Sequence, residues 1–240
     1  AKALARAVDA QGWRFAVAHF RGCSGEPNRL PRAYHSGDSA EIGWILQRFA
    51  ARANGAPLFA AGVSLGGNAL LKWLGETGAD APVQAAAAIS APLHLQICGD
   101  ALALGFNKVY TRMFLRTMKR LAEAKFARHP GIFDAAAMRR SRTLREFDNV
   151  VTAPLHGFRD TDDYWSKASS LPLLGRIGRP TLVLNARDDP FVPVQALPDP
   201  AGLPGCVQAE FPEHGGHVGF VSGGFPGQLD WLPARVLHHF

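Results

Sequence analysis

The sequence predicts an α/β fold with a mostly parallel sheet, and three observations support this prediction. Strand-like and helix-like segments alternate along the chain, as they do in βαβ units. A short apolar run, residues 58–63, leads directly into a tight turn and a helix-like segment. Polar loops follow the last two strand-like segments. Because ligands bind beyond the carboxyl ends of parallel strands, we expect the functional residues at that edge of the sheet.

Length and composition are typical of one globular domain, which we expect to span residues 1–240. The chain has 240 residues, of which 47% are hydrophobic and 19% charged, so it can bury a sizeable core. No apolar run reaches the roughly eighteen residues of a membrane span. The three cysteines are widely spaced and outside any C-x-x-C pattern. They therefore predict neither a disulfide framework nor a zinc site, and a reducing, cytoplasmic compartment is expected.

The amino-terminal half predicts two helices and two strands before the central turn. Apolar residues at helical spacing predict a helix over residues 1–11, and residues 14–20 are strand-like. A second helix is expected after residues 36–38, which offer capping side chains, and it ends before residues 54–57. Residues 58–63 are predicted as a strand that is buried on both faces.

The carboxyl-terminal half predicts three more strands and a closing helix. By periodicity alone residues 83–91 fit a helix or a strand, but their length, flanking prolines and alternation favour a strand of small residues. Clear strands are predicted over residues 181–186 and 207–211, and the closing helix over about residues 228–237.

Between these strands, residues 92–172 carry helical patterns only, and we expect a helical cap inserted into the domain. Its longest helix is predicted over residues 108–125. Residues 108–145 hold eleven Lys and Arg residues and only two acidic ones. A solvated face explains most such patterns, while peripheral contact with an anionic membrane or an anionic acyl substrate is the alternative. Nucleic-acid binding is not predicted, because no aromatic or glycine pattern accompanies the charge.

The turn after residues 58–63 carries the pattern G-x-S-x-G, centred on Ser64. Its glycines remove Cβ atoms that would collide with the neighbouring strand and helix. The turn is expected to hold the Ser64 hydroxyl above the sheet edge. There the Leu65 N–H and the helix dipole can stabilise an oxyanion. An ordinary glycine-rich turn is the alternative, and the strand–turn–helix setting disfavours it.

A serine nucleophile needs a base and a carboxylate, and the chain supplies both in the order Ser, Asp, His. His217 lies in a glycine-rich loop directly after the last strand, and His214 is its rival. Of the two adjacent carboxylates, Asp188 is favoured because it comes first after the strand, whereas Asp189 precedes a proline and could hold the loop. No His or Glu stands at ligand spacing around them, so neither a metal nor a cofactor is predicted.

Four motifs in register are more specific than the serine pattern alone. They occupy residues 20–28, 62–68, 185–191 and 214–220. Together they resemble the YheT-type α/β-hydrolase family. The resemblance implies hydrolysis of an acyl ester or lipid through an acyl-enzyme. It assigns Ser64 as nucleophile, Asp188 as acid and His217 as base.

The resemblance also implies that the domain is incomplete at its amino end. The family places further strands before the helix with which this chain begins, and a His-Gly motif there supplies a second oxyanion donor. We therefore expect an unpaired strand edge in the sheet. Two other functions stay open: acyl transfer to an alcohol with the same triad, and a non-catalytic binding or scaffold role.

Overall fold

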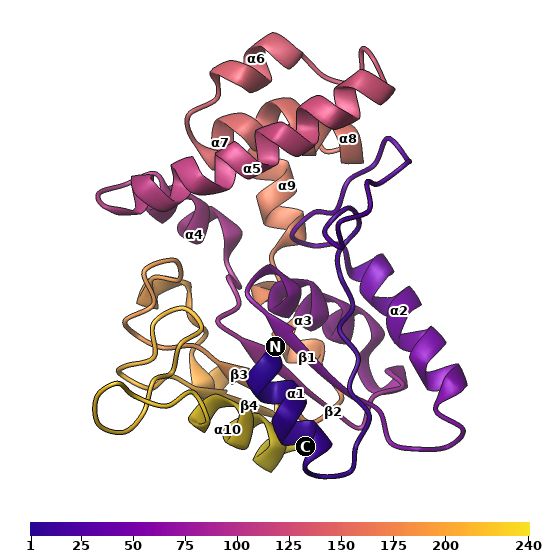
Figure 1. Ribbon diagram of the computed structural model, residues 1–240, viewed down its shortest axis with the longest axis vertical. Coiled ribbons are helices and arrows are strands. Elements are labelled where there is room, and N and C mark those ends of the chain that lie inside the picture. Colours follow the sequence, from indigo (N-terminus) through magenta and orange to yellow (C-terminus); the bar gives the residue numbers. More distant parts are fainter. The chain divides into compact units, whose positions relative to one another are not determined.

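The computed structural model describes residues 1–240, which divide into two compact units. The sheet unit consists of Ala1–Ala18, Ser36–Leu93 and Ser169–Phe240. The helical unit consists of His19–His35 and His94–Ala168. Figure 1 shows the elements of both units, and each is described below by itself.

The sheet unit is built on four parallel strands in the order β1-β2-β3-β4 (Figure 1). Their bounds are Phe59–Val63, Ala85–Ile89, Thr181–Leu184 and Val207–Glu210. This sheet confirms the predicted fold class, and it confirms that residues 83–91 form a strand rather than a helix. Because β2 and β3 lie in the middle of the sheet, every one of their side chains is buried.

The register of the sheet aligns the ends of its strands. Val63 of β1 pairs with Ile89 of β2, which in turn pairs with Leu184 of β3, and Leu184 pairs with Glu210 of β4. All four loops that follow therefore begin at one edge. Ser64 and the loops after β3 and β4 share this carboxyl edge, as parallel pairing predicts.

Strand β1 lies at the border of the sheet and pairs only with β2. The predicted strand over residues 14–20 is wrong, because these residues pair with no strand in the structure. A strand depends on ladder hydrogen bonds to a neighbour, and here none form. The prediction that residues 58–63 are buried on both faces also fails, since Ala61 and Val63 are exposed.

Helices cover both faces of the sheet unit. They are α1 (Lys2–Asp9), α2 (Ser39–Arg52), α3 (Leu65–Thr77) and α10 (Trp231–His239). Short 3-10 turns occupy Gly78–Asp80, Leu171–Arg176, Val194–Ala196 and Pro200–Gly202. The four helices correspond to the predicted ones, with ends displaced by a few residues.

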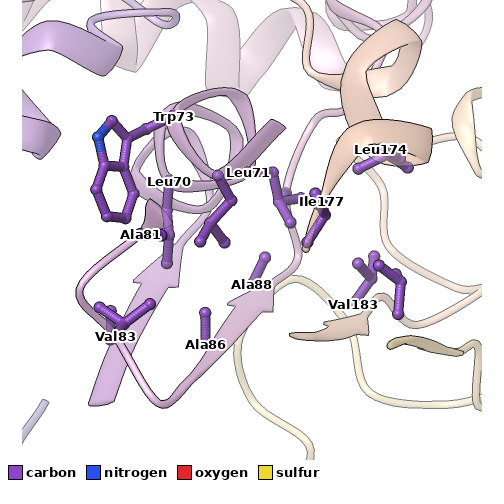
Figure 2. Close-up of a cluster of buried hydrophobic side chains, with 14 of the residues drawn as sticks. Leu70, Leu71, Trp73, Ala81, Val83, Ala86, Ala88, Leu174, Ile177 and Val183 are labelled. Atoms are coloured by element: carbon purple, nitrogen blue, oxygen red, sulfur yellow. The ribbon is translucent and has the colours of Figure 1, made fainter. Parts of the chain in front are cut away.

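Side chains that alternate along the strands pack in two apolar cores, one on each face of the sheet. On one face Ala86, Ala88 and Val183 pack with Leu71 of α3 and with Leu174, as Figure 2 shows. On the other face Ile89, Leu182 and Leu184 pack with Val236 of α10 and with Leu4 of α1. This alternation follows from the two-residue period of a strand. Both faces of the strands that end at the carboxyl edge are therefore packed in an apolar core.

The helical unit contains seven helical segments and two apolar cores of its own. The α-helices are α4 (Leu95–Leu102), α5 (Asn107–Arg128), α6 (Ala135–Arg140), α7 (Leu144–Phe147), α8 (Ala153–His156) and α9 (Thr161–Ala168). A π-helical turn, Asp148–Thr152, joins α7 to α8. Residues 19–35 belong to this unit as well. No helix of the chain is both long enough and apolar enough to cross a membrane.

Candidate active site

Ser64 occupies a strained turn between β1 and α3. Its φ of 53° and ψ of −124° lie in a backbone region that residues other than glycine rarely adopt. The Ser64 N–H donates to the Ile89 carbonyl at 2.8 Å, and the Ser64 carbonyl accepts from the Gly67 N–H at 2.9 Å. These bonds tie the turn to β2 and to α3. The serine hydroxyl makes no capping bond to α3, so it stays available to another partner.

The glycines of the motif are required by the close approach of strand and helix. A Cβ atom on Gly62 would lie 2.5 Å from the Gly66 carbonyl oxygen and 2.8 Å from the Gly67 Cα. A Cβ atom on Gly67 would lie 2.9 Å from the Ala91 Cβ. Because backbone atoms leave no room to yield, a larger residue at position 62 would displace the turn that carries Ser64.

His217 joins Ser64 to a buried carboxylate. Its Nε2 lies 2.9 Å from the Ser64 hydroxyl oxygen, and its Nδ1 lies 2.8 Å from Oδ2 of Asp189. The side chain of Asp189 is fully buried, and that of His217 is 18% exposed. A carboxylate accepts the Nδ1–H, so we assign the tautomer that carries its proton on Nδ1 and leaves Nε2 to accept the serine proton. This is the row of donors and acceptors that activates a serine.

The loop after β3 fixes Asp189 for this contact. The second carboxylate oxygen of Asp189, Oδ1, accepts the Phe191 N–H at 2.8 Å, and the Asp189 N–H donates to the Ala186 carbonyl. The ring of Phe191 in turn lies edge-on to the His217 imidazole, with 4.6 Å between their centres. The aspartate and the histidine are therefore both held from two sides.

The structure does not place Asp188 against His217, and this corrects the expected contact. Asp188 Oδ1 accepts the N–H groups of Gly215 and Gly216 at 2.9 and 2.8 Å, and Oδ2 lies 3.3 Å from His214 Nδ1. The bond from Gly216 and, after it, the contact with His214 hold the pKa of Asp188 below its usual value. The side chain of His214, the rival base, is 92% exposed and contacts Asp188, whereas Ser64 contacts His217. Asp188 thus fixes the loop that carries His217.

The reason is that the extended pairing continues past the end of β3. The Asn185 N–H donates to the Glu210 carbonyl, and the Arg187 N–H donates to the Pro212 carbonyl, so backbone pairing beyond β3 continues to Arg187, past the predicted strand end at residue 186. The inward position therefore falls on Asp189 rather than on Asp188. Counting from the last apolar residue of a strand cannot detect this extension, because it depends on bonds to a chain segment distant in sequence.

Leu65 is placed as the sequence predicted, at the first position of α3. Its N–H is among the first-turn donors that a helix leaves without an internal partner. The N-terminal end of the helix dipole adds partial positive charge there. An oxyanion on a carbonyl bonded to Ser64 is within the field of this helix end.

Asn68 supports the site in a way that sequence reasoning missed. The side chain is fully buried, its Nδ2 donates to the Ser36 carbonyl at 2.8 Å, and its Oδ1 accepts the Ser170 N–H at 3.0 Å. The amide thus ties the first turn of α3 to two distant segments of the sheet unit. A polar residue among the apolar residues and glycines at the start of a helix is the available signal.

Within residues 1–240 no group of three or more His, Cys, Asp or Glu side chains is arranged to hold a metal ion. The chemistry offered by the described residues is that of a hydroxyl, an imidazole and a carboxylate in sequence. Such a row performs acyl transfer through the serine.

Comparisons with known proteins show the family of the chain. The family model described as "alpha/beta hydrolase fold" matches residues 1–224. YheT of Escherichia coli, provisionally named an esterase, is 43% identical over 98% of this chain, which spans 70% of that protein. Phospholipase ABHD3 of Mus musculus is 34% identical over 95% of this chain, which spans 56% of it.

Solved structures show the same fold at lower identity. An esterase of Pyrococcus furiosus superposes with a TM-score of 0.58 at 15% identity, covering 99% of this chain and 74% of the other. A monoacylglycerol lipase of Paleococcus ferrophilus superposes with a TM-score of 0.52 at 14% identity, covering 99% and 88%. The family match, the YheT similarity and the parallel sheet confirm the resemblance seen in the sequence: the chain belongs to the α/β-hydrolase family, among its YheT-like members.

Proposed function

We propose that this protein is a serine-dependent carboxylic-ester hydrolase with Ser64, His217 and Asp189 as its catalytic triad. The observation that carries the proposal is the unbroken row of hydrogen-bond contacts from the Ser64 hydroxyl through His217 to the buried Asp189. The names of two relatives, an esterase and a phospholipase, support an acyl ester or a lipid as the substrate class.

The first half-reaction forms an acyl-enzyme. His217 Nε2 takes the proton of Ser64 as its oxygen attacks the ester carbonyl, and Asp189 stabilises the resulting imidazolium. The oxyanion is held by the Leu65 N–H at the start of α3. When the intermediate collapses, the imidazolium gives its proton to the leaving alkoxide, and the alcohol departs.

The second half-reaction releases the acid. A water molecule gives a proton to His217 and attacks the acyl carbonyl, forming a second oxyanion at the same place. Collapse of this intermediate breaks the bond to Ser64, whose oxygen recovers the proton from His217. An alcohol in place of water would give a new ester by the same steps.

Labelling with a fluorophosphonate probe tests the proposal directly. We expect the probe to modify Ser64 and to fail on Ser64→Ala, while Ser24→Ala, an exposed serine outside the site, labels like the original chain. Absence of labelling on the folded protein would overturn the hydrolase assignment and favour a scaffold role. Product analysis of an activated ester, with and without added ethanol, then separates hydrolysis from acyl transfer.

A further inference from the structure

Helix α5, which Figure 1 shows as the long helix of the helical unit, exposes both apolar and basic side chains to solvent. One stripe of the helix, with Thr111, Leu115 and Ala122, is buried, and Leu115 and Ala122 belong to an apolar core of the unit. The helix surface outside this stripe is largely exposed. We call its amino-terminal part the α5 outer face and define it by Leu104 and Phe106, which precede the helix, and by the exposed Lys108, Val109, Arg112, Met113, Arg116 and Arg120.

The apolar members of this face are large and strongly exposed. Leu104, Phe106 and Met113 are 65%, 74% and 62% exposed, and Val109 is exposed as well. Phe106, Val109 and Met113 follow one another at intervals of three and four residues, so they lie on one side of the helix. Single exposed apolar residues are common on proteins, but a contiguous apolar patch is typical of a surface that binds a protein, a membrane or a ligand.

The cations of the same face are not neutralised by the chain. Lys108, Arg112, Arg116 and Arg120 have no ion pair and no side-chain hydrogen bond within residues 1–240. The one acidic residue of α5, Glu123, is bound by Arg139 through two hydrogen bonds. The face therefore carries a positive field that no neighbouring carboxylate offsets.

Two other lysines of α5 show what a structural cation does in this unit. Lys119 donates to the carbonyls of Arg139 and Ser141, and Lys125 donates to those of Leu30 and Arg32. Both hold segments of the helical unit together. The cations of the α5 outer face make no such hydrogen bonds, so their presence is not explained by a contribution to the stability of the helical unit.

We propose that the α5 outer face is a peripheral binding surface for an anionic lipid bilayer. Apolar tips enter the boundary between headgroups and acyl chains, while arginines and lysine beside them pair with lipid phosphates. A bilayer supplies both an apolar layer and dense negative charge in the same place, which fits a face where the two kinds of side chain are interleaved. The proposal goes beyond the proposed function and does not require the triad to be active.

Vesicle co-sedimentation tests the proposal with the Ser64→Ala chain, so that lipid cleavage plays no part. The vesicles are of phosphatidylcholine alone or of phosphatidylcholine with about a third phosphatidylglycerol. We expect binding to the anionic vesicles only, and weaker binding as salt rises. Replacing Arg112, Arg116 and Arg120 together by Gln should lower the partition coefficient on the order of a hundredfold. Phe106→Ser with Met113→Ser should lower it on the order of tenfold or more.

A matched control removes equal charge elsewhere. Arg6, Arg14 and Arg52 are exposed cations of the sheet unit, and replacing all three by Gln should leave binding nearly unchanged. Equal loss in this control would overturn the proposal, because net charge alone would then explain binding. Binding that ignores anionic lipid, or that survives the Phe106 and Met113 changes in full, would overturn it as well. Self-association through this face without vesicle binding would assign it to a second copy of the chain instead.

Discussion

Asp189 lies 2.8 Å from the imidazole of His217, while the adjacent Asp188 points its carboxylate at the backbone of the loop that carries this histidine. Two neighbouring carboxylates thus serve one histidine by different routes. Asp189 contacts the ring, and Asp188 holds the ring's loop. The contact of Asp189 with the imidazole and the contact of Asp188 with the loop backbone can be tested separately, by substitution of each side chain.

Asp189→Asn should abolish most activity without unfolding the chain. The amide has nearly the same shape, but it no longer favours the Nδ1–H tautomer or the imidazolium, so we expect kcat to fall about 10⁴-fold. Hydrolysis of an activated short-chain ester measures this. Asp188→Asn is the matched control, and a larger loss in that variant would exchange the two roles.

Removal of the Asp188 side chain should loosen the loop rather than remove a catalytic group. Asp188→Ala leaves the Gly215 and Gly216 N–H groups without their acceptor, so His217 is less well oriented and kcat falls on the order of tenfold to a hundredfold. Asp188→Asn retains one acceptor oxygen, so its kcat should lie between those of the original chain and of Asp188→Ala. Amide hydrogen exchange around residues 214–218 should accelerate in the Ala variant, and unchanged exchange there would contradict the anchoring role.

Gly62→Ala should destabilise the fold, because its Cβ would collide with the Gly66 carbonyl 2.5 Å away. Backbone must move to relieve this contact, and we expect a loss of about 3 kcal/mol or more in the free energy of unfolding. Urea denaturation measures the loss. Gly205→Ala is the control, since a Cβ there meets nothing within 4 Å. Equal stability of the two variants would show that the strand and helix can separate at no cost.

Asp148 should make stability depend on pH. Burial raises the pKa of Asp148 to about 6, against the hydrogen bonds from Thr152 and Trp165 that favour its charged form. Since the unfolded value is near 4, the folded chain binds more protons between about pH 4 and 6. Stability therefore falls as pH rises through this range, by roughly 3 kcal/mol, and levels off above it.

The Trp165 indole N–H reports this titration, because it donates to Asp148 at 2.8 Å. Its NMR signal should shift with a midpoint near pH 6. Asp148→Asn should remove the shift and flatten the stability between these pH values, whereas Asp9→Asn, at an exposed position, should do neither. A midpoint near pH 4 would contradict the effect of burial.

Much of the fold follows from local pattern, as the small-residue strand β2 illustrates. Its run of alanines between prolines predicts a strand, because short, flanked apolar segments favour buried strands, and the structure confirms this strand. The segment 14–20 has a similar local pattern but forms no strand, since pairing depends on a neighbour and not on the segment itself. Whether a segment finds a strand to pair with cannot be read from the sequence of that segment alone.

The parallel α/β class, the strand–turn–helix position of Ser64 and the position of His217 after the last strand can all be predicted from the sequence. These follow from strand–turn–helix order, from glycine spacing and from the alignment of parallel strand ends. Which carboxylate contacts His217, and that residues 19–35 belong to the helical unit, can be seen only in the three-dimensional structure. The reason is physical: each of these depends on hydrogen bonds or packing between segments far apart in the chain, and a one-residue change in where a turn begins reverses which side chain points inward.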